Sequence, residues 1–254
     1  KPVLQVEDLS VRNEKGVMAV EGVSFTIHEG EIFGIAGVSG NGQQELAESL
    51  AGLRKAEQGK VILNGQEITS DSSLERWQAG IGYIPSERNE VGSIGDFSLV
   101  DNVIMNYHFD HNFTHQGILD YKGIRKLTEE LIAEYEVATP NADITAKCLS
   151  GGNLQRLILA RVISRKPLLV IANLPTQGLD VGAIEFVQNK LMQAKKDKAA
   201  ILLISGELDE VMSLSDWVAP MYEGKFMGIL PGDGTKREDV GAMMAGMTLE
   251  ALEK

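Results

Sequence analysis

The sequence has one cysteine, Cys148, among its 254 residues, so it can form neither an internal disulfide nor a cysteine-based metal cluster. No apolar run approaches the roughly 18 residues that a membrane-spanning helix needs. The first residues, Lys1-Pro2-Val3-Leu4, show neither a signal-peptide pattern nor an initiating Met. These absences predict a cytosolic protein with a reduced thiol, cut from a longer chain.

Positive charge is also scarce. The chain has 24 Lys and Arg against 36 Asp and Glu, a formal net charge of −12. This balance argues against nucleic acid as a partner, because nucleic-acid surfaces need clustered cations. Hydrophobic residues make up 43% of the chain, which predicts a globular protein of one large or two small domains with a substantial core.

Apolar runs and turns predict an α/β fold. Short strands are expected in the N-terminal third, and buried strands return at 168–172 and 200–204, separated by a helix at about 181–195. Strands that alternate with helices are typical of βαβ units with a parallel sheet. The segment from about 86 to 166 is more polar and has helical periodicity, so we expect an inserted helical lobe there.

A glycine-rich loop follows the apolar segment 31–36 and precedes an expected helix at 44–50. Its residues are Gly37-Val38-Ser39-Gly40-Asn41-Gly42-Gln43-Gln44. The spacing is that of a phosphate-binding loop, G-x-x-x-x-G-K-[ST], in which backbone N–H groups at a helix N-terminus hold a phosphate. Such a loop taken alone is also compatible with tight packing that binds no ligand.

The two residues that carry the ionic chemistry of this loop are altered. Gln43 stands where the pattern has Lys, a cation whose attraction to a phosphate 4 Å away is on the order of 4 kcal/mol at an effective dielectric near 20. Gln44 stands where a Ser or Thr hydroxyl would hold Mg²⁺, and its amide oxygen is a longer-armed substitute. Phosphate affinity is therefore expected to depend on backbone amides, and Mg²⁺ binding is left open.

A second motif is Leu149-Ser150-Gly151-Gly152-Asn153-Leu154-Gln155-Arg156. An apolar strand after it runs into Leu174-Pro175-Thr176, followed by Gly178-Leu179-Asp180. In this order the motifs resemble the nucleotide-binding domain of ATP-binding cassette (ABC) transporters over nearly the whole chain. Tyr83-Ile84-Pro85-Ser86-Glu87-Arg88 and Gly182-Ala183-Ile184-Glu185 most resemble the second cassette of the double-cassette ATPase of bacterial simple-sugar and nucleoside importers, with the glycine loop nearest the nucleoside branch.

The resemblance implies a P-loop NTPase fold of the ABC type, a single domain over 1–254. A RecA-like parallel-sheet core and an antiparallel β subdomain would occupy about 1–85 and 167–254, and the helical lobe about 86–166. In this family two cassettes pair, and each ATP lies between the phosphate loop of one and the signature motif of the other. The chain would thus be part of a longer tandem protein.

The resemblance also assigns roles to residues. The signature residues would meet ATP on a catalytic first cassette; they are Leu149, Ser150, Gly151, Gly152, Asn153 and Gln155. Gly178, Leu179 and Asp180 would form the D-loop that links the two ATP sites, and Ser86 and Glu87 lie in the Q-loop that transmits motion to the membrane subunit. The alternative for Ser150 to Gly152 is an ordinary helix cap, and Gly178 to Asp180 alone could be a turn and a cap.

The residues of hydrolysis are missing by the same comparison. Asn173-Leu174 stands where the family has Asp-Glu, and Gly206 stands in place of the switch histidine, with Glu207 one residue out of register. A leucine cannot act as a general base, and residues 11–19 offer no aromatic for adenine. No catalytic residue is therefore expected, and ATP would be shared at the cassette interface and weakly held on the chain's own loop.

The expected function is that of a degenerate cassette in a bacterial importer of simple sugars or nucleosides, peripheral on the inner face of the cell membrane. Its partners would be the first cassette, permease subunits and, indirectly, a solute-binding protein. Two alternatives stay open: a regulatory ABC module without transport, and an active ATPase with unusual ligands such as Glu207 or Glu87. The transported solute is not fixed by the sequence.

Three histidines, His108, His111 and His115, have a spacing that invites comparison with a metal site. The segment from Asn106 to Gly117 is polar and turn-like, however. We therefore expect a solvated loop there, and no metal site.

Overall fold

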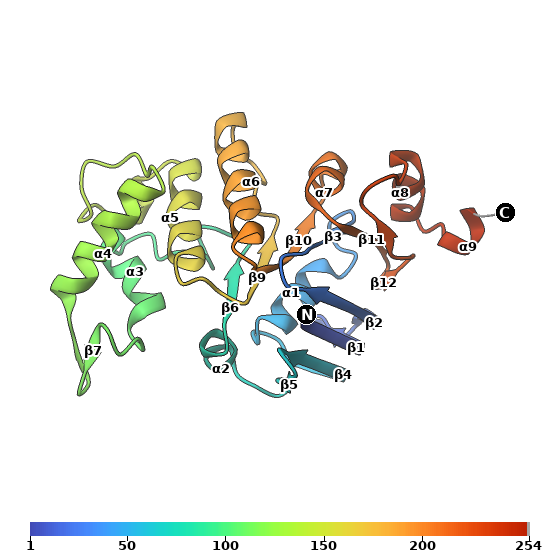
Figure 1. Ribbon diagram of the computed structural model, residues 1–254, viewed down its shortest axis with the longest axis horizontal. Helices are drawn as coiled ribbons and strands as arrows, with labels where there is room; N and C mark the ends of the chain where they lie inside the picture. Colours follow the sequence, from blue (N-terminus) through green and yellow to red (C-terminus); the bar gives the residue numbers. More distant parts are fainter. Residues whose placement is uncertain (253–254) are drawn as a thin grey trace. The chain divides into compact units, whose positions relative to one another are not determined.

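The structure is a computed structural model that describes residues 1–252 (Figure 1). The chain divides into two compact units, which are described separately. The first contains residues 1–83, 166–174 and those from 191 onward, and the second contains 84–165 and 175–190. The second unit thus takes up residues 175–190, which the sequence had assigned to the core.

The first unit carries two sheets. The antiparallel sheet has the order β2-β1-β4-β5, formed by β1 (Pro2–Arg12), β2 (Met18–His28), β4 (Ala56–Leu63) and β5 (Gln66–Glu67). The larger sheet has the order β12-β11-β3-β10-β9-β6, with β13 added beside β11. Its strands are β3 (Ile32–Ala36), β6 (Ile81–Ile84), β9 (Leu169–Asn173), β10 (Ala200–Ser205), β11 (Trp217–Tyr222), β12 (Lys225–Phe226) and β13 (Leu230–Pro231).

The central strands of the larger sheet are parallel and buried. β10 pairs in parallel with β3 and with β9, and every residue of these three strands is buried. Continuous burial is what parallel strands covered on both faces require, which explains their unbroken apolar sequences. The helices of this unit are α1 (Gln43–Leu50), α2 (Ser73–Gln78), α7 (Leu208–Leu214), α8 (Arg237–Met244) and α9 (Leu249–Leu252).

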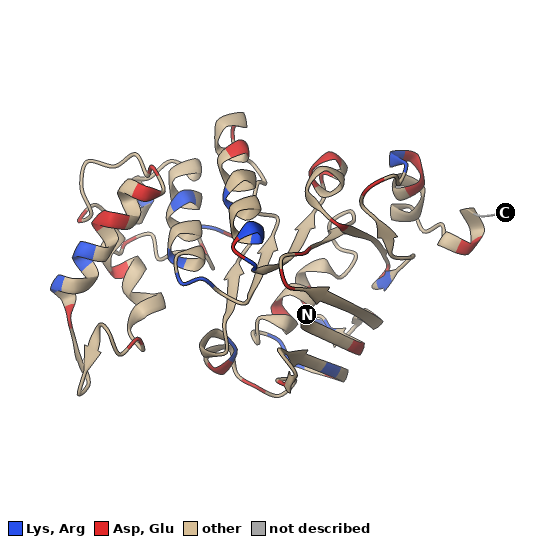
Figure 2. Cartoon of the chain, in the orientation of Figure 1, with Lys and Arg blue, Asp and Glu red and all other residues tan. Residues whose placement is uncertain are grey.

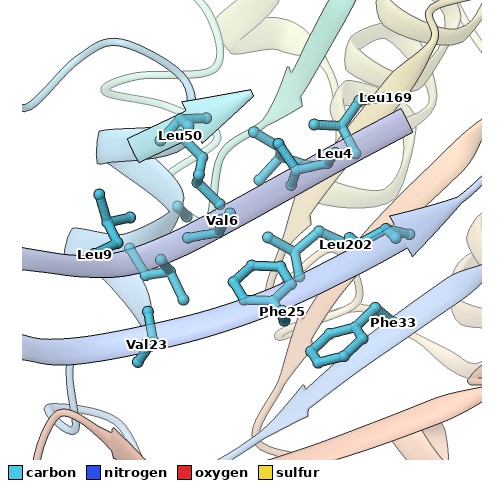
Figure 3. Packing of buried hydrophobic residues seen from close by; sticks show 14 of the residues in the cluster. Leu4, Val6, Leu9, Val23, Phe25, Phe33, Leu50, Leu169 and Leu202 are labelled. Carbon is cyan, nitrogen blue, oxygen red and sulfur yellow. The ribbon is translucent and has the colours of Figure 1, made fainter. Parts of the chain in front are cut away.

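The main core of the first unit lies between the two sheets (Figure 3). Leu4, Val6 and Leu9 of β1 reach into it, and the rings of Phe25 and Phe33 stack with centroids 4.9 Å apart. Leu50 brings α1 into the same cluster. Because α1 follows the glycine loop directly, this packing fixes the position of the loop. A smaller cluster around Ala36, Val211, Val218 and Val240 involves α7 and α8.

The second unit is mainly helical. It contains α3 (Leu99–Tyr107), α4 (Tyr121–Glu134), a 3₁₀ turn η1 (Ala146–Cys148), α5 (Gly151–Ile163) and the first part of α6 (Val181–Lys196). A small hairpin of β7 (Thr114–His115) and β8 (Ile118–Leu119) begins within the segment predicted to be a loop and extends just past its end. Helix α5 begins at Gly151, directly after Ser150 of the second motif.

Surface charges are mixed in sign. On α4, basic and acidic residues share one helix (Figure 2), and Arg125 and Lys126 pair with Glu129 and Glu130 one turn away. None of the described helices has both the length and the apolar character needed to cross a membrane.

Candidate functional site

The residues of the predicted nucleotide site meet at one edge of the large sheet. Ser205 of β10 is level with Ala36 of β3, and Ile204 is level with Asn173 of β9. The carboxyl ends of parallel strands are where α/β proteins place their ligands. A Cβ added to Gly206 would lie 3.7 Å from the carbonyl oxygen of Gly37. Three segments far apart in sequence are therefore neighbours in the first unit.

The loop between β3 and α1 has the backbone of a phosphate loop. Gly40 and Gly42 adopt left-handed conformations, with φ of 93° and 100°. A side chain at Gly42 would also collide with the carbonyl oxygen of Ala19, so only glycine fits there. Ser39 is exposed at the tip of the loop. Gly42 caps α1 without a side-chain acceptor, as expected of a helix N-terminus that offers its N–H groups to an anion.

Gln43 fills the loop from inside. Its side chain is buried; Oε1 accepts the Asn41 N–H at 3.1 Å, and Nε2 donates to the Val38 carbonyl at 3.0 Å. A Cβ added to Gly37 would collide with the same Nε2 atom. One of the loop's N–H groups is thus already bonded to the chain's own amide, a group with neither the length nor the charge of a lysine.

Asn41 fastens the loop to the turn between β11 and β12. Its Oδ1 accepts the Glu223 N–H at 2.8 Å, its carbonyl accepts the Gly224 N–H at 3.0 Å, and its Nδ2 donates to the Val38 carbonyl at 3.0 Å. This contact could not be predicted from the sequence, because the two segments are far apart along the chain.

Gln44 and Asn173 bond to each other. Asn173 Nδ2 donates to Gln44 Oε1 at 2.6 Å, and Gln44 Nε2 donates to Glu48 Oε1 at 2.7 Å. In a magnesium-binding loop these two positions supply a hydroxyl and a carboxylate to the metal. Mg²⁺ takes oxygen ligands and favours carboxylates, whereas here an N–H group of Asn173 points at the only side-chain oxygen of Gln44. The residues present do not fit the usual metal site.

The positions that the resemblance assigns to hydrolysis carry Leu174 and Gly206. Leu174 is half-buried, with a left-handed φ of 48°, and its N–H donates to the Ile204 carbonyl at 2.9 Å. Glu207 is exposed at the cap of α7, where its side chain makes no capping bond. Glu87 is exposed in the other unit.

A cavity of about 590 Å³ lies beside the glycine loop in the first unit. Its lining includes Met18, Gly40, Glu45, Tyr222 and Met227. Residues 11–19 offer no aromatic at the expected adenine position, but Tyr222 of β11, far away in the sequence, lines this cavity. The ring of Tyr222 packs close to Gly246, where a Cβ would lie 2.9 Å from it.

The signature motif starts α5 in the second unit. Ser150 caps the helix: its Oγ accepts the Asn153 N–H at 3.4 Å and Asn153 Nδ2 at 3.0 Å. Asn153 Oδ1 in turn accepts the Ala138 N–H at 2.8 Å. Gly151 is exposed, and a Cβ there would have open space within 4 Å. The motif therefore presents a capped, uncovered helix N-terminus.

The D-loop packs beside the signature helix in the same unit. A Cβ on Gly152 would lie 3.2 Å from Ala183 Cβ and 3.6 Å from Asp180 Oδ2. Asp180 Oδ1 accepts the Ala183 N–H at 2.9 Å and so caps α6, and the Leu179 N–H donates to the Thr176 carbonyl at 3.2 Å. The structure brings these two predicted motifs together.

Gln155 is a correction to the sequence-based site. We expected it to face the partner's ATP along with Ser150, but its side chain is buried and Nε2 donates to the Pro175 carbonyl at 2.7 Å. Its helical spacing from Ile158, Leu159 and Val162 places it on the apolar face of α5 and could have revealed this. Gln155 holds the turn that leads to the D-loop instead.

Arg88 was not among the site residues predicted from the sequence, although it contacts the turn before Gly178. Its Nη2 donates to the Gln177 carbonyl at 2.7 Å, directly before Gly178, and burial lowers the pKa of its guanidinium from the ordinary value. The Q-loop residue Glu87, next to it, accepts the N–H groups of Val91 and Gly92 through its carbonyl at 3.0 and 2.8 Å. Ser86 is half-buried beside them.

The three histidines do not gather. His108, His111 and His115 are exposed, and His108 Nδ1 lies 3.0 Å from the Met105 carbonyl oxygen. Within residues 1–252, no group of three or more His, Cys, Asp or Glu side chains is arranged to hold a metal ion.

Comparison with known proteins agrees with this geometry. A sequence model of the family "ABC transporter" matches residues 20–177, more than half of the chain. The fold is that of a P-loop ATP-binding cassette: a nucleotide-free cassette from an ABC transporter superposes with a TM-score of 0.78 at 18% identity, covering 100% of this chain and 98% of its own. A cassette in a dimeric post-hydrolysis state bound to ADP and Pi gives 0.76 at 21%, covering 91% and 100%. The chain belongs to the ABC transporter family.

Several curated proteins that are similar to this chain in sequence are import ATP-binding proteins. The guanosine import ATP-binding protein NupO of Bacillus subtilis is 40% identical over 99% of this chain and 49% of its own length. The nucleoside import ATP-binding protein NupA of Lactococcus lactis is 36% identical over 96% and 48%. The glucose import ATP-binding protein TsgD13 of Haloferax volcanii is 40% identical over 97% and 45%. The chain thus spans about half the length of the curated relatives it matches.

Proposed function

We propose that this chain is a catalytically degenerate nucleotide-binding domain of an importer for nucleosides or simple sugars, and that it lends its signature motif to ATP on a partner cassette. Its own phosphate loop would hold nucleotide weakly and would not hydrolyse it. The partner would be a catalytic first cassette in the same longer protein, which is consistent with relatives about twice as long. The chain would lie on the inner face of the cell membrane against transmembrane permease subunits, which a solute-binding protein would serve.

The observation that carries the proposal is the contrast between the two motifs. The groups of the phosphate site are paired with one another: Gln43 with its own loop, and Gln44 with Asn173. The signature end of α5 is open, with Gly151 exposed and Ser150 at the cap. An uncovered helix N-terminus attracts phosphate through its N–H groups and dipole. One site is therefore closed on itself, while the other is available to a partner.

Gly151 offers a sharp test because it can be changed without disturbing the fold. Gly151→Asp puts a carboxylate in the first turn of α5, where the helix dipole favours it by about 0.3–1 kcal/mol, and where a Cβ meets nothing. The same carboxylate would repel the phosphates of ATP on the partner. Gly241→Asp is the matched control, since Gly241 lies in α8 with equally open space for a Cβ.

We expect Gly151→Asp, in the intact two-cassette protein assembled with its permease, to lower ATP turnover at least tenfold while leaving the thermal unfolding midpoint unchanged or raised. The protein with Gly241→Asp should turn over ATP at the rate of the native protein. Undiminished turnover in the Gly151→Asp protein would contradict signature donation. Failure to co-purify with any permease would favour a regulatory module over a transporter component.

A further inference from the structure

The side chains of the degenerate site form a continuous hydrogen-bonded series. Asn173 donates to Gln44 and Gln44 donates to Glu48, at 2.6 and 2.7 Å. Glu48 Oε2 then accepts from Arg54, with Nη2 2.6 Å away. The series begins at the end of β9, crosses to α1 and ends at a partly buried cation. It joins residues 129 positions apart, so it forms only in the folded first unit.

An amide pair can do the structural work of a cation between two oxygens. Where a hydroxyl and a carboxylate face each other in this fold, a metal ion holds them together. Here the side-chain N–H of Asn173 carries the partial positive charge and donates directly to Gln44 Oε1. The negative charge of Glu48, the next group, is balanced by Arg54. The charges in this series are therefore balanced without a metal ion.

Admitting a metal would leave a buried group unpaired. Asn173 is 1% exposed, and among the described residues its Oδ1 has no hydrogen-bond partner. If Gln44 Oε1 turned to a cation, Nδ2 of Asn173 would lose its acceptor too. A buried polar group left without a partner destabilises the folded state. The pair therefore opposes metal binding as well as making it unnecessary.

The glycine loop is also held in place by hydrogen bonds between groups of the chain. The Gln43 amide spans from the Val38 carbonyl to the Asn41 N–H, and the Asn41 side chain and backbone hold the loop to the β11–β12 turn. These bonds are made between groups of the chain alone. They fix the loop where a phosphate would otherwise be needed to collect its N–H groups.

We propose that the Asn173–Gln44 hydrogen bond takes the place of Mg²⁺ in this cassette, so that the site keeps its closed shape without metal and any nucleotide it takes up is held independently of a divalent cation. The inference deepens the function proposed above and rests on it, because it describes the site whose own ATP chemistry has been given up. The cassette would stay ready for pairing whether or not its own loop carries nucleotide, and only the partner's site would respond to Mg²⁺.

Mn²⁺ is a suitable probe, because it replaces Mg²⁺ at oxygen ligands and can be counted by electron paramagnetic resonance. The intact two-cassette protein would be titrated with Mn²⁺ at saturating ATP. We expect one tightly bound Mn²⁺, at the partner's site, in the native protein. The double variant Gln44→Ser with Asn173→Asp should bind a second Mn²⁺ at least tenfold more tightly than the native protein does.

The control carries the same two chemical changes at exposed positions, Gln193→Ser with Asn64→Asp, and should bind one Mn²⁺. Two equally tight Mn²⁺ ions in the native protein would overturn the proposal. So would a double variant that folds, as judged by its retained partner-site Mn²⁺, yet gains no second ion. If the double variant does not fold, the native count alone decides. Signature donation is read separately, from turnover of the Gly151→Asp protein, so the two ideas can fail independently.

Discussion

Arg88 donates a 2.7 Å hydrogen bond from Nη2 to the carbonyl of Gln177, a residue 89 positions later. Within the second unit this bond joins the segment of the predicted Q-loop to the start of the predicted D-loop. Gly178, which follows, is left-handed with φ of 68°, and a Cβ there would lie 3.5 Å from Arg88 Nη2. Arg88 thus braces the turn that presents Asp180.

Arg88→Ala should loosen this turn. We expect faster amide hydrogen exchange over residues 177–180, and ATP turnover of the two-cassette protein lowered several-fold with little change in its KM for ATP. Arg88→Lys should recover only part of the loss, because an ammonium is a point donor on a flexible stem. Arg125→Ala, at an exposed arginine of the same unit, is the control; equal effects from both would refute the positioning role.

Leu174→Glu should not by itself create an ATPase. A positioned general base contributes about 10²- to 10⁴-fold, but only when the phosphate and its metal are already held. Under the proposed function, Gln43, Gln44 and Asn173 would hold neither firmly. In a protein whose partner cassette has lost its phosphate-loop lysine, we expect no phosphate release from Leu174→Glu. Release should appear only when Gln43→Lys, Gln44→Ser and Asn173→Asp are added. Turnover by the single variant would show that other residues bind the metal.

Arg76 should be a main source of stability for the helix that follows the phosphate loop. It is 3% exposed and donates to the carbonyls of Ser49 and Leu50 at the C-terminal end of α1, at 2.6 and 2.9 Å, and to those of Thr69 and Asp71. Burial lowers the pKa of its guanidinium.

Arg76→Met would leave these carbonyls without their charged donor. Hydrogen bonds to charged groups are worth about 1.5–3 kcal/mol each, so we expect the unfolding free energy in urea to fall by about 2–4 kcal/mol. Arg12→Met removes an exposed arginine paired with Glu57 and should cost less than about 1 kcal/mol. A similar loss from both variants would mean that the carbonyls of α1 are satisfied in another way.

The fold was readable from the sequence because its strands and helices carry their own signals. The unbroken apolar runs of β9 and β10 and the spacing around α5 predicted parallel strands and a helix. The motifs located the sheet edge and the signature helix, since glycine positions and a serine cap are local features. Gln155 was misplaced because the motif was given more weight than the helical period.

The pairings inside the site could not be read in this way. Nothing local to Gln44 indicates that its acceptor will be used by Asn173, 129 residues away, or that Asn41 will bind the turn at Glu223. These bonds depend on the register of β3, β9, β10 and β11, which only the folded sheet defines. The sequence shows which residues stand at these positions, and the structure shows which hydrogen bonds they make.

Cys148 can report on the pairing of cassettes. It is exposed in η1, two residues before Ser150, with its Sγ 3.3 Å from Thr145 Oγ1. If Ser150 and Gly151 meet ATP on a partner, this thiol lies at the edge of that contact, and a maleimide reagent should reach it more slowly once ATP is bound. In a protein whose other cysteines have been replaced, we expect ATP to slow the reaction at least fivefold.

The Gly151→Asp protein should show no slowing, because its carboxylate repels the nucleotide. A cysteine introduced as Gly241→Cys in a Cys148→Ser background should react at the same rate with and without ATP, which separates local cover from a general effect of nucleotide. An unchanged rate at Cys148 under turnover conditions would mean that the signature end of α5 does not meet the partner's ATP.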